Sequence, residues 1–161
     1  MKTLTVFYSR TGNTKKIAKE IAKLVQGDME EIIDEKNRKG LLGWLISGMD
    51  AFLKRYTTIK QIEKNPSQYD IVIVGTPIWA TNISTPIRTY IHNYKDGFKN
   101  TAFFCTSAGD RPKDTLKIFK DMENLCSKNP AALISFSERN VKANSFEKIK
   151  EFAEKIKKLK L

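Results

Sequence analysis

The stretch Val6-Phe7-Tyr8-Ser9-Arg10-Thr11-Gly12-Asn13-Thr14 decides how the rest of this 161-residue chain is interpreted. Its apolar start has the chemistry of a buried strand, and hydroxyl and amide side chains follow it. A helical spacing of apolar residues begins at Ile17. A strand, a polar turn and a helix N-terminus in this order are typical of a phosphate site, because free backbone N–H groups and the positive helix end face the anion. A plain helix cap after a buried strand is the alternative interpretation.

This turn differs from two well-known glycine-rich phosphate motifs. No lysine follows Gly12 at the spacing of a Walker loop, and the Gly-x-Gly-x-x-Gly pattern is absent. A phosphate here would therefore be held mainly by neutral donors. Four side chains of the turn can add hydrogen bonds to those of the backbone: Ser9, Thr11, Asn13 and Thr14.

The composition is that of a globular protein with an excess of positive charge. The length of 161 residues favours a single domain over residues 1–161, and the 40% apolar and 29% charged fractions are typical of a soluble globular protein. No apolar run approaches the ~20 residues of a membrane span, and the start lacks a signal-peptide profile, so we predict a cytoplasmic protein with no membrane span. The net charge of +11 favours anionic partners. No RNA motif, zinc finger or helix-turn-helix is recognisable, and nucleic-acid binding is not predicted.

Metal binding and nucleophilic catalysis have little support in the sequence. Cys105 and Cys126 are not clustered with other metal-ligand residues, and His92 is the only histidine. We therefore predict no metal site and no essential catalytic side chain. Both cysteines are expected to be small core residues.

Five expected strands alternate with five expected helices. The strands are predicted at 2–8, 29–34, 71–75, 101–105 and 131–136, and the helices at 14–24, 41–53, 84–91, 113–125 and 145–159. This alternation predicts a parallel sheet with helices on both faces, joined by right-handed crossovers. Ligands of such sheets bind beyond the carboxyl ends of the strands, so the loops after the first, third and fourth strands should meet at one edge.

Two of the helices carry more specific expectations. The stretch 41–53 has an unusually broad apolar face, which favours a crossover helix packed on the sheet. The alternative is that Trp44, Met49 or Phe52 walls a ligand cleft or a subunit contact. In the helix at 113–125, four side chains are expected to face inward: Leu116, Phe119, Met122 and Leu125.

The three loops at the predicted edge suit a phosphorylated aromatic cofactor. The first, which suits the phosphate, comprises Ser9, Arg10, Thr11, Gly12, Asn13 and Thr14. The second supplies a large flat indole for ring stacking and comprises Thr76, Pro77, Ile78, Trp79, Ala80, Thr81 and Asn82. The third offers backbone groups around small residues and comprises Thr106, Ser107, Ala108, Gly109 and Asp110.

These patterns resemble the flavodoxin-like FMN-binding proteins over nearly the whole chain. The opening pattern of the family's phosphate loop is matched by Ser9, Gly12, Thr14, Ala18 and Ile21. Thr5 departs from it, since an aliphatic residue is usual there. The resemblance also includes Gly-Thr-Pro-Ile-Trp from residue 75, Thr-Ser-Ala-Gly from residue 106 and the order of the elements. It is greatest with small, short-chain flavodoxin-domain proteins that carry a basic Lys-Gly-Leu-Leu-Gly helix, here at residues 39–43.

The resemblance implies a flavodoxin-like three-layer α/β sandwich with a five-stranded parallel sheet in the order 2-1-3-4-5. It also implies FMN as a non-covalent cofactor, with phosphate contacts from residues 9–14 and ring contacts from residues 77–82 and 107–110. A response-regulator receiver is disfavoured, because Ser9-Arg10 and Thr76-Pro77 stand where its acidic residues are needed. A low-molecular-weight phosphatase is disfavoured too, since no cysteine lies in the first loop.

The use of the bound FMN stays open between two classes. Electron transfer of flavodoxin type between redox partner proteins is favoured by the resemblance, and an NAD(P)H-dependent FMN oxidoreductase acting on a quinone or flavin is the alternative. The best-known flavodoxins are acidic, whereas this chain is basic, which would disrupt docking to the same partner faces. Asp110-Arg111-Pro112-Lys113 stands where their third loop usually has an aromatic residue.

One face of the ring is therefore expected to be open. Arg10, Arg111 and Lys113 are candidate attractors of a small anionic or quinone-like substrate, or ordinary solvated charges. A non-redox alternative is a flavin-free domain that binds a partner through the helix around Trp44. The sequence is compatible with a monomer or a homodimer.

Overall fold

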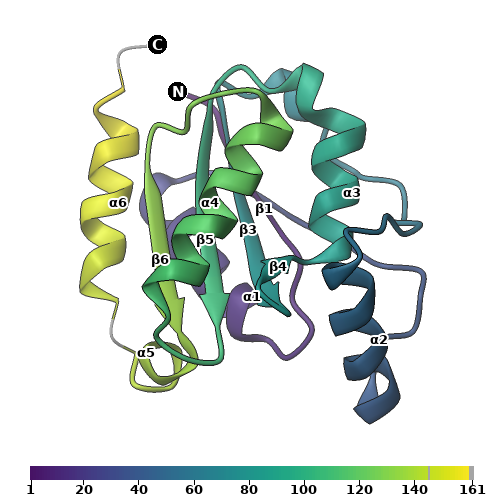
Figure 1. The fold of residues 1–161 in the computed structure, drawn as a ribbon. Helices are drawn as coiled ribbons and strands as arrows, with labels where there is room; N and C mark the ends of the chain where they lie inside the picture. The colour runs from purple at the N-terminus through teal and green to yellow at the C-terminus, as the bar shows by residue number, and fades with distance from the viewer. Residues whose placement is uncertain (145, 160–161) are drawn as a thin grey trace.

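The computed structural model describes residues 1–144 and 146–159 and shows a sheet with helices on both faces (Figure 1). The parallel strands are β1 (Thr3–Phe7), β2 (Asp28–Glu31), β3 (Ile71–Trp79), β5 (Thr101–Ser107) and β6 (Leu133–Ser137). They pair in the order β2-β1-β3-β5-β6. Counted along the chain without the short β4, this is the predicted order 2-1-3-4-5, and the predicted fold class is confirmed.

The helices form a layer on each face of the sheet. They are α1 (Asn13–Val25), α2 (Gly40–Phe52), α3 (Thr85–Tyr94), α4 (Pro112–Cys126), α5 (Glu138–Lys142) and α6 (Glu147–Lys157), with 3-10 turns η1 (Pro66–Gln68) and η2 (Lys95–Gly97). Helices α1, α5 and α6 contribute to the apolar cluster on one face, and α3 and α4 to the cluster on the other. The predicted last helix corresponds to α6, the short helix α5 before it was not predicted, and the predicted first residue, 145, lies outside the described residues.

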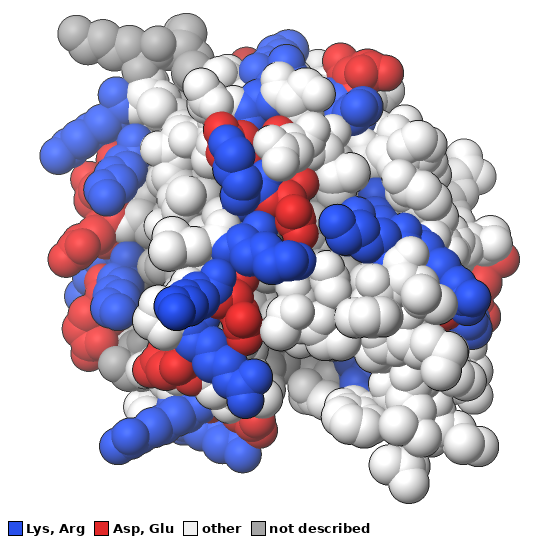
Figure 2. Space-filling model, viewed as in Figure 1, with Lys and Arg blue, Asp and Glu red and all other residues white. Residues whose placement is uncertain are grey.

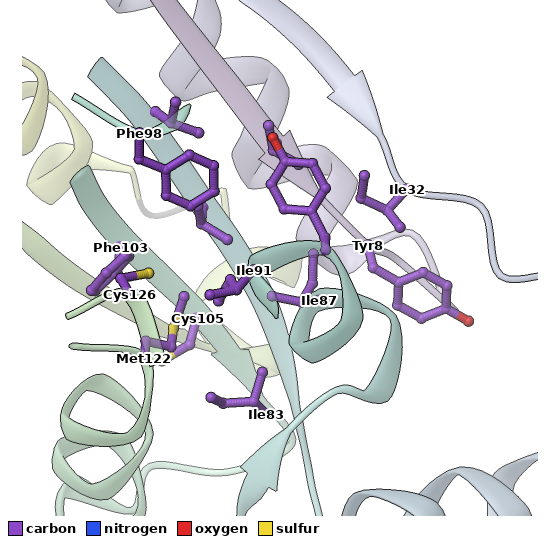
Figure 3. Close-up of a cluster of buried hydrophobic side chains, with 14 of the residues drawn as sticks. Tyr8, Ile32, Ile83, Ile87, Ile91, Phe98, Phe103, Cys105, Met122 and Cys126 are labelled. Atoms are coloured by element: carbon purple, nitrogen blue, oxygen red, sulfur yellow. The ribbon is translucent and has the colours of Figure 1, made fainter. Parts of the chain in front are cut away.

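Alternation along the strands divides the core between the two faces, because successive side chains of a strand point to opposite sides. Leu4 and Val6 pack toward α3, whereas Phe7 packs toward α1. Figure 3 shows the first of these clusters, with Cys105 and Cys126 within it. Both thiols are buried, and burial raises the pKa of each to about 12. Their prediction as core residues is confirmed.

The predicted loop after the third strand is partly a hairpin. Strand β3 continues beyond Gly75 to Trp79, and a turn at Ala80 and Thr81 leads into the antiparallel strand β4 (Asn82–Ile83). Both turn residues have positive φ, 45° and 57°, as a tight two-residue hairpin of this hand requires. Alanine and threonine rarely adopt that conformation, so the sequence carried no turn signal here.

The apolar faces of two helices differ from the predicted ones. Helix α2 does not pack its broad apolar face on the sheet: its buried residues are Gly43, Ser47, Asp50 and Ala51. On α4, Leu116 is 68% exposed instead of facing inward. Ile118 is buried beside Phe119 and Met122, which are buried as predicted, and Leu125 is partly buried against the same cluster.

Candidate functional site

The three predicted loops meet at the carboxyl-end edge of the sheet, the lower edge in Figure 1. They line two cavities of about 730 and 220 Å³. The two cavities lie side by side, because both are lined by Trp44, Ile78, Trp79, Ser107 and Ala108. The first loop reaches only the smaller cavity, and the second and third loops reach both.

The N-terminus of α1 lies at the smaller cavity and can bind an anion there. Gly12 is the N-cap residue, at a φ of 92° that glycine adopts without strain, and its N–H donates to Ser9 Oγ at 3.1 Å. Within the described residues, no side chain caps this helix end. The N–H groups of the first turn are therefore left for a ligand. The buried Thr14 hydroxyl is 2.8 Å from that of Thr106, which joins the first loop to the third.

Trp79 stands at the junction of the two cavities and is held from two sides. Its ring centroid lies 5.4 Å from that of Tyr8 in an edge-to-face arrangement, with an interplanar angle of 87°. The Arg38 guanidinium lies 5.4 Å from the same indole ring. Burial raises the pKa of Tyr8 to about 12, so its hydroxyl keeps its proton at neutral pH. The indole orientation is thus set before any ligand binds.

The Arg38 guanidinium beside Trp79 belongs to a buried ion-pair network. The Arg38 side chain is 2% exposed and pairs with Asp34 and, at 3.0 Å, with Asp50. Lys36 Nζ lies 2.9 Å from the same Asp50 carboxylate. Burial alone would raise the pKa of Asp50, but hydrogen bonds from Lys36 and Arg38 outweigh it and the pKa is lowered. The network joins the loop before α2 to the inner side of α2.

Most predicted site residues line the cavities. They are Arg10, Thr11, Asn13, Thr14, Pro77, Ile78, Trp79, Ala80, Thr81, Thr106, Ser107, Ala108 and Gly109. The predicted residues that do not line them are Ser9, Gly12, Thr76, Asn82 and Asp110.

Three of these latter residues hold the loops in place. Ser9 accepts the Gly12 N–H, as described above. The Thr76 hydroxyl lies 2.9 Å from that of Ser84, the N-cap residue of α3. The Asn82 amide donates to the Ala80 carbonyl at 2.7 Å across the hairpin turn.

Helix α2 supplies a wall of the larger cavity. Trp44, Leu45, Ser47, Gly48 and Met49 line it, together with Arg111 and Asp114 near the start of α4. Trp44 and Met49, two of the three residues proposed from the sequence to wall a ligand cleft or a subunit contact, line this cavity, whereas Phe52 lines neither cavity. The sequence analysis did not predict five of the lining residues: Leu45, Ser47, Gly48 and Asp114 in the larger cavity and Glu138 in the smaller one. The broad apolar face of 41–53 was the one signal that could have pointed to α2.

A family model described as Flavodoxin matches residues 2–155 of the sequence. The chain belongs to the flavodoxin family. The resemblance inferred from the loop residues is therefore confirmed. No curated protein matches the chain.

Solved structures show the same flavodoxin fold. A Lactobacillus acidophilus NCFM flavoprotein, solved in complex with FMN, is 24% identical, with a TM-score of 0.70 over 89% of this chain and 98% of that one. Oxidised Flavodoxin 1 from Bacillus cereus is 19% identical, with a TM-score of 0.58 over 99% of each chain. A flavodoxin, WrbA-like protein from Agrobacterium tumefaciens is 15% identical, with a TM-score of 0.57 over 95% of each chain.

Proposed function

We propose that this flavodoxin-family protein binds FMN non-covalently in the paired cavities and transfers electrons through it. The observation that carries the proposal is the placement of an uncapped helix N-terminus and a fixed indole at adjoining cavities. The family match and the FMN-bound Lactobacillus neighbour support the same cofactor. FMN would supply the redox chemistry, and the protein would bind, orient and shield it.

The smaller cavity is suited to the phosphate of FMN. The α1 N-terminus offers free N–H donors and a positive dipole end, and Arg10 at the cavity adds a full positive charge. In this proposal residues 9–14 contact the phosphate. Ser9 and Gly12 contribute through loop geometry and backbone, which fits their absence from the cavity lining.

The isoalloxazine ring would lie between the second and third loops. Trp79 offers an indole face for stacking, while the small side chains of residues 107–109 allow backbone groups to approach the ring edge. The third loop has no aromatic residue. Trp44 from α2 lines both cavities and can provide the second aromatic surface.

Replacing Thr14 by valine should weaken FMN binding by about 1–2 kcal/mol, because it removes a buried hydroxyl at the phosphate loop and its hydrogen bond to Thr106. The affinity can be measured by quenching of flavin fluorescence as apoprotein is added. Thr11→Val is an informative companion, since Thr11 lines the same cavity and is exposed. Unchanged FMN affinity in both variants would argue against a phosphate at this loop.

A reductase is the second candidate, and the larger cavity favours it. About 730 Å³ lies beside Trp79 and is bordered by Arg111, which leaves room for a second small molecule. NADH and NADPH should be titrated anaerobically into the FMN-loaded protein, with dithionite added last. We expect no bleaching of the flavin absorbance by either nicotinamide and full bleaching by dithionite, as for an electron carrier. Rapid bleaching by a nicotinamide would assign the reductase activity instead.

A further inference from the structure

Helix α2 has its apolar residues on the outside. Eight large apolar side chains of 41–53 are exposed: Leu41, Leu42, Trp44, Leu45, Ile46, Met49, Phe52 and Leu53. Leu42 is 75% and Phe52 69% exposed. In Figure 2, drawn from the same side as Figure 1, the surface at the position of α2 is almost free of charge. Exposed apolar patches of this kind mark interaction sites.

Ion pairs and a close backbone contact fix the rotation of α2 about its own axis, so that its apolar residues face outward. Asp50 lies on its inner side and binds Arg38, Lys36 and Arg55. A Cβ atom on Gly43 would lie 2.3 Å from the Arg38 carbonyl carbon, so only glycine lets the helix approach this closely. Rotating α2 to bury its leucines would separate Asp50 from Arg38 and leave the buried Arg38 with Asp34 as its only ionic partner among the described residues, which is costly. The outward apolar face is therefore a stable feature of the fold.

Exposed cations stand at both ends of this apolar face. Lys36 and Lys39 precede the helix, and Lys54 and Arg55 follow it. Between residues 36 and 55 the only acidic residue is Asp50, whose carboxylate is buried in the ion pairs. Asp50 pairs with Lys36, Arg38 and Arg55 together, so the surface combines apolar side chains with an excess of positive charge, and the whole chain carries +11.

We propose that the outer face of α2 docks on an anionic lipid surface. A helix that inserts leucine, tryptophan and phenylalanine at the acyl boundary, with lysine and arginine at the headgroups, binds anionic membranes peripherally. The described residues contain no helix long and apolar enough to cross a bilayer, so the contact is interfacial. Because Trp44, Leu45 and Met49 also line the larger cavity, docking would place that cavity beside the lipid surface.

The charges favour lipid over the other occupants of this face. In a contact between two copies, an antiparallel pairing of α2 brings Lys36 and Lys39 of one copy near Lys54 and Arg55 of the other. A parallel pairing brings each basic end of α2 near the same basic end of the other copy. Both pairings set like charges against one another, which opposes association. Transient contacts between redox proteins are small, whereas this face is a broad apolar one.

Vesicle co-sedimentation tests the proposal. Wild-type protein should sediment with vesicles of equal parts phosphatidylglycerol and phosphatidylcholine, remain free with phosphatidylcholine alone, and be released by raised salt. The Leu42→Ser/Phe52→Ser variant should bind at least about tenfold more weakly, because it removes two of the most exposed apolar groups. Leu133→Ser, at an exposed leucine on β6, is the control and should bind like wild type.

The charge contribution has its own matched pair of variants. Lys39→Gln/Lys54→Gln should weaken binding severalfold, and Lys148→Gln/Lys155→Gln, with the same loss of charge on α6, should have little effect. Flavin binding should persist in every variant, since none of these residues lines the cavities. No binding by wild type, or equal losses in variants and controls, would overturn the proposal. If the wild-type protein were a dimer that does not bind vesicles, and Leu42→Ser/Phe52→Ser made it monomeric, the face would be assigned to contact with a second copy.

Discussion

Replacing Trp79 by alanine is expected to weaken FMN binding by ~1–3 kcal/mol, which is about 5- to 150-fold in Kd. The indole offers the flat stacking surface at the junction of the two cavities. Its loss also frees Tyr8 and Arg38, which hold the indole on two sides, so the site loses preorganisation as well as area. Fluorescence titration of the apoprotein with FMN measures the change.

Two further variants separate stacking from packing at this position. Trp79→Phe keeps an aromatic face and should retain most of the affinity. Trp44→Ala removes the exposed aromatic on the α2 wall of the cavities and keeps Trp79 in place. If Trp79→Ala bound FMN as tightly as wild type while its apoprotein unfolded at lower temperature, Trp79 would be a packing residue only.

Replacing Asp50 by asparagine should lower the free energy of unfolding by about 3 kcal/mol. It removes the carboxylate that binds Arg38 at 3.0 Å and leaves a buried guanidinium with Asp34 as its remaining ionic partner. Chemical denaturation at neutral pH measures the loss. Glu154→Gln is the matched control: it breaks an exposed pair with Lys157 and should cost less than about 1 kcal/mol.

The effect of Asp50→Asn should depend on pH in a defined direction. The pKa of Asp50 is lowered in the folded protein from its usual 3.8. Its stabilisation is therefore fully present above pH ~4 and is lost as the pH falls through the lowered folded pKa. The difference between wild type and variant should shrink on acidification below pH ~4. A difference that stayed constant or grew there would mean that Asp50 acts through packing and not through charge.

The loops were predictable because their residues are close together in the sequence. The stretch from Ser9 to Thr14 follows a buried strand and begins a helix, and Trp79 is the last residue of another strand. Alternation of strands and helices then implies the same sheet edge for all three loops. Membership of the flavodoxin family was likewise predictable from these residues.

The hairpin and the α2 wall were not predictable in this way. Ala80 and Thr81 adopt left-handed conformations without any local turn signal, and Lys117, which is distant in sequence, donates to the Thr81 carbonyl at 2.9 Å. The apolar face of 41–53 looked like a core face because hydrophobic periodicity records how apolar residues are spaced, not which side they turn to.

The sequence by itself determined the parallel α/β fold, the family and the meeting of three loops, since strand order and local turn chemistry follow from short-range patterns. Only the tertiary structure decided that α2 turns its leucines outward and its aspartate inward. That choice depends on the buried pairing of Asp50 with Arg38, because either charge buried without the other would carry an uncompensated desolvation cost. No pattern within α2 alone contains that partner.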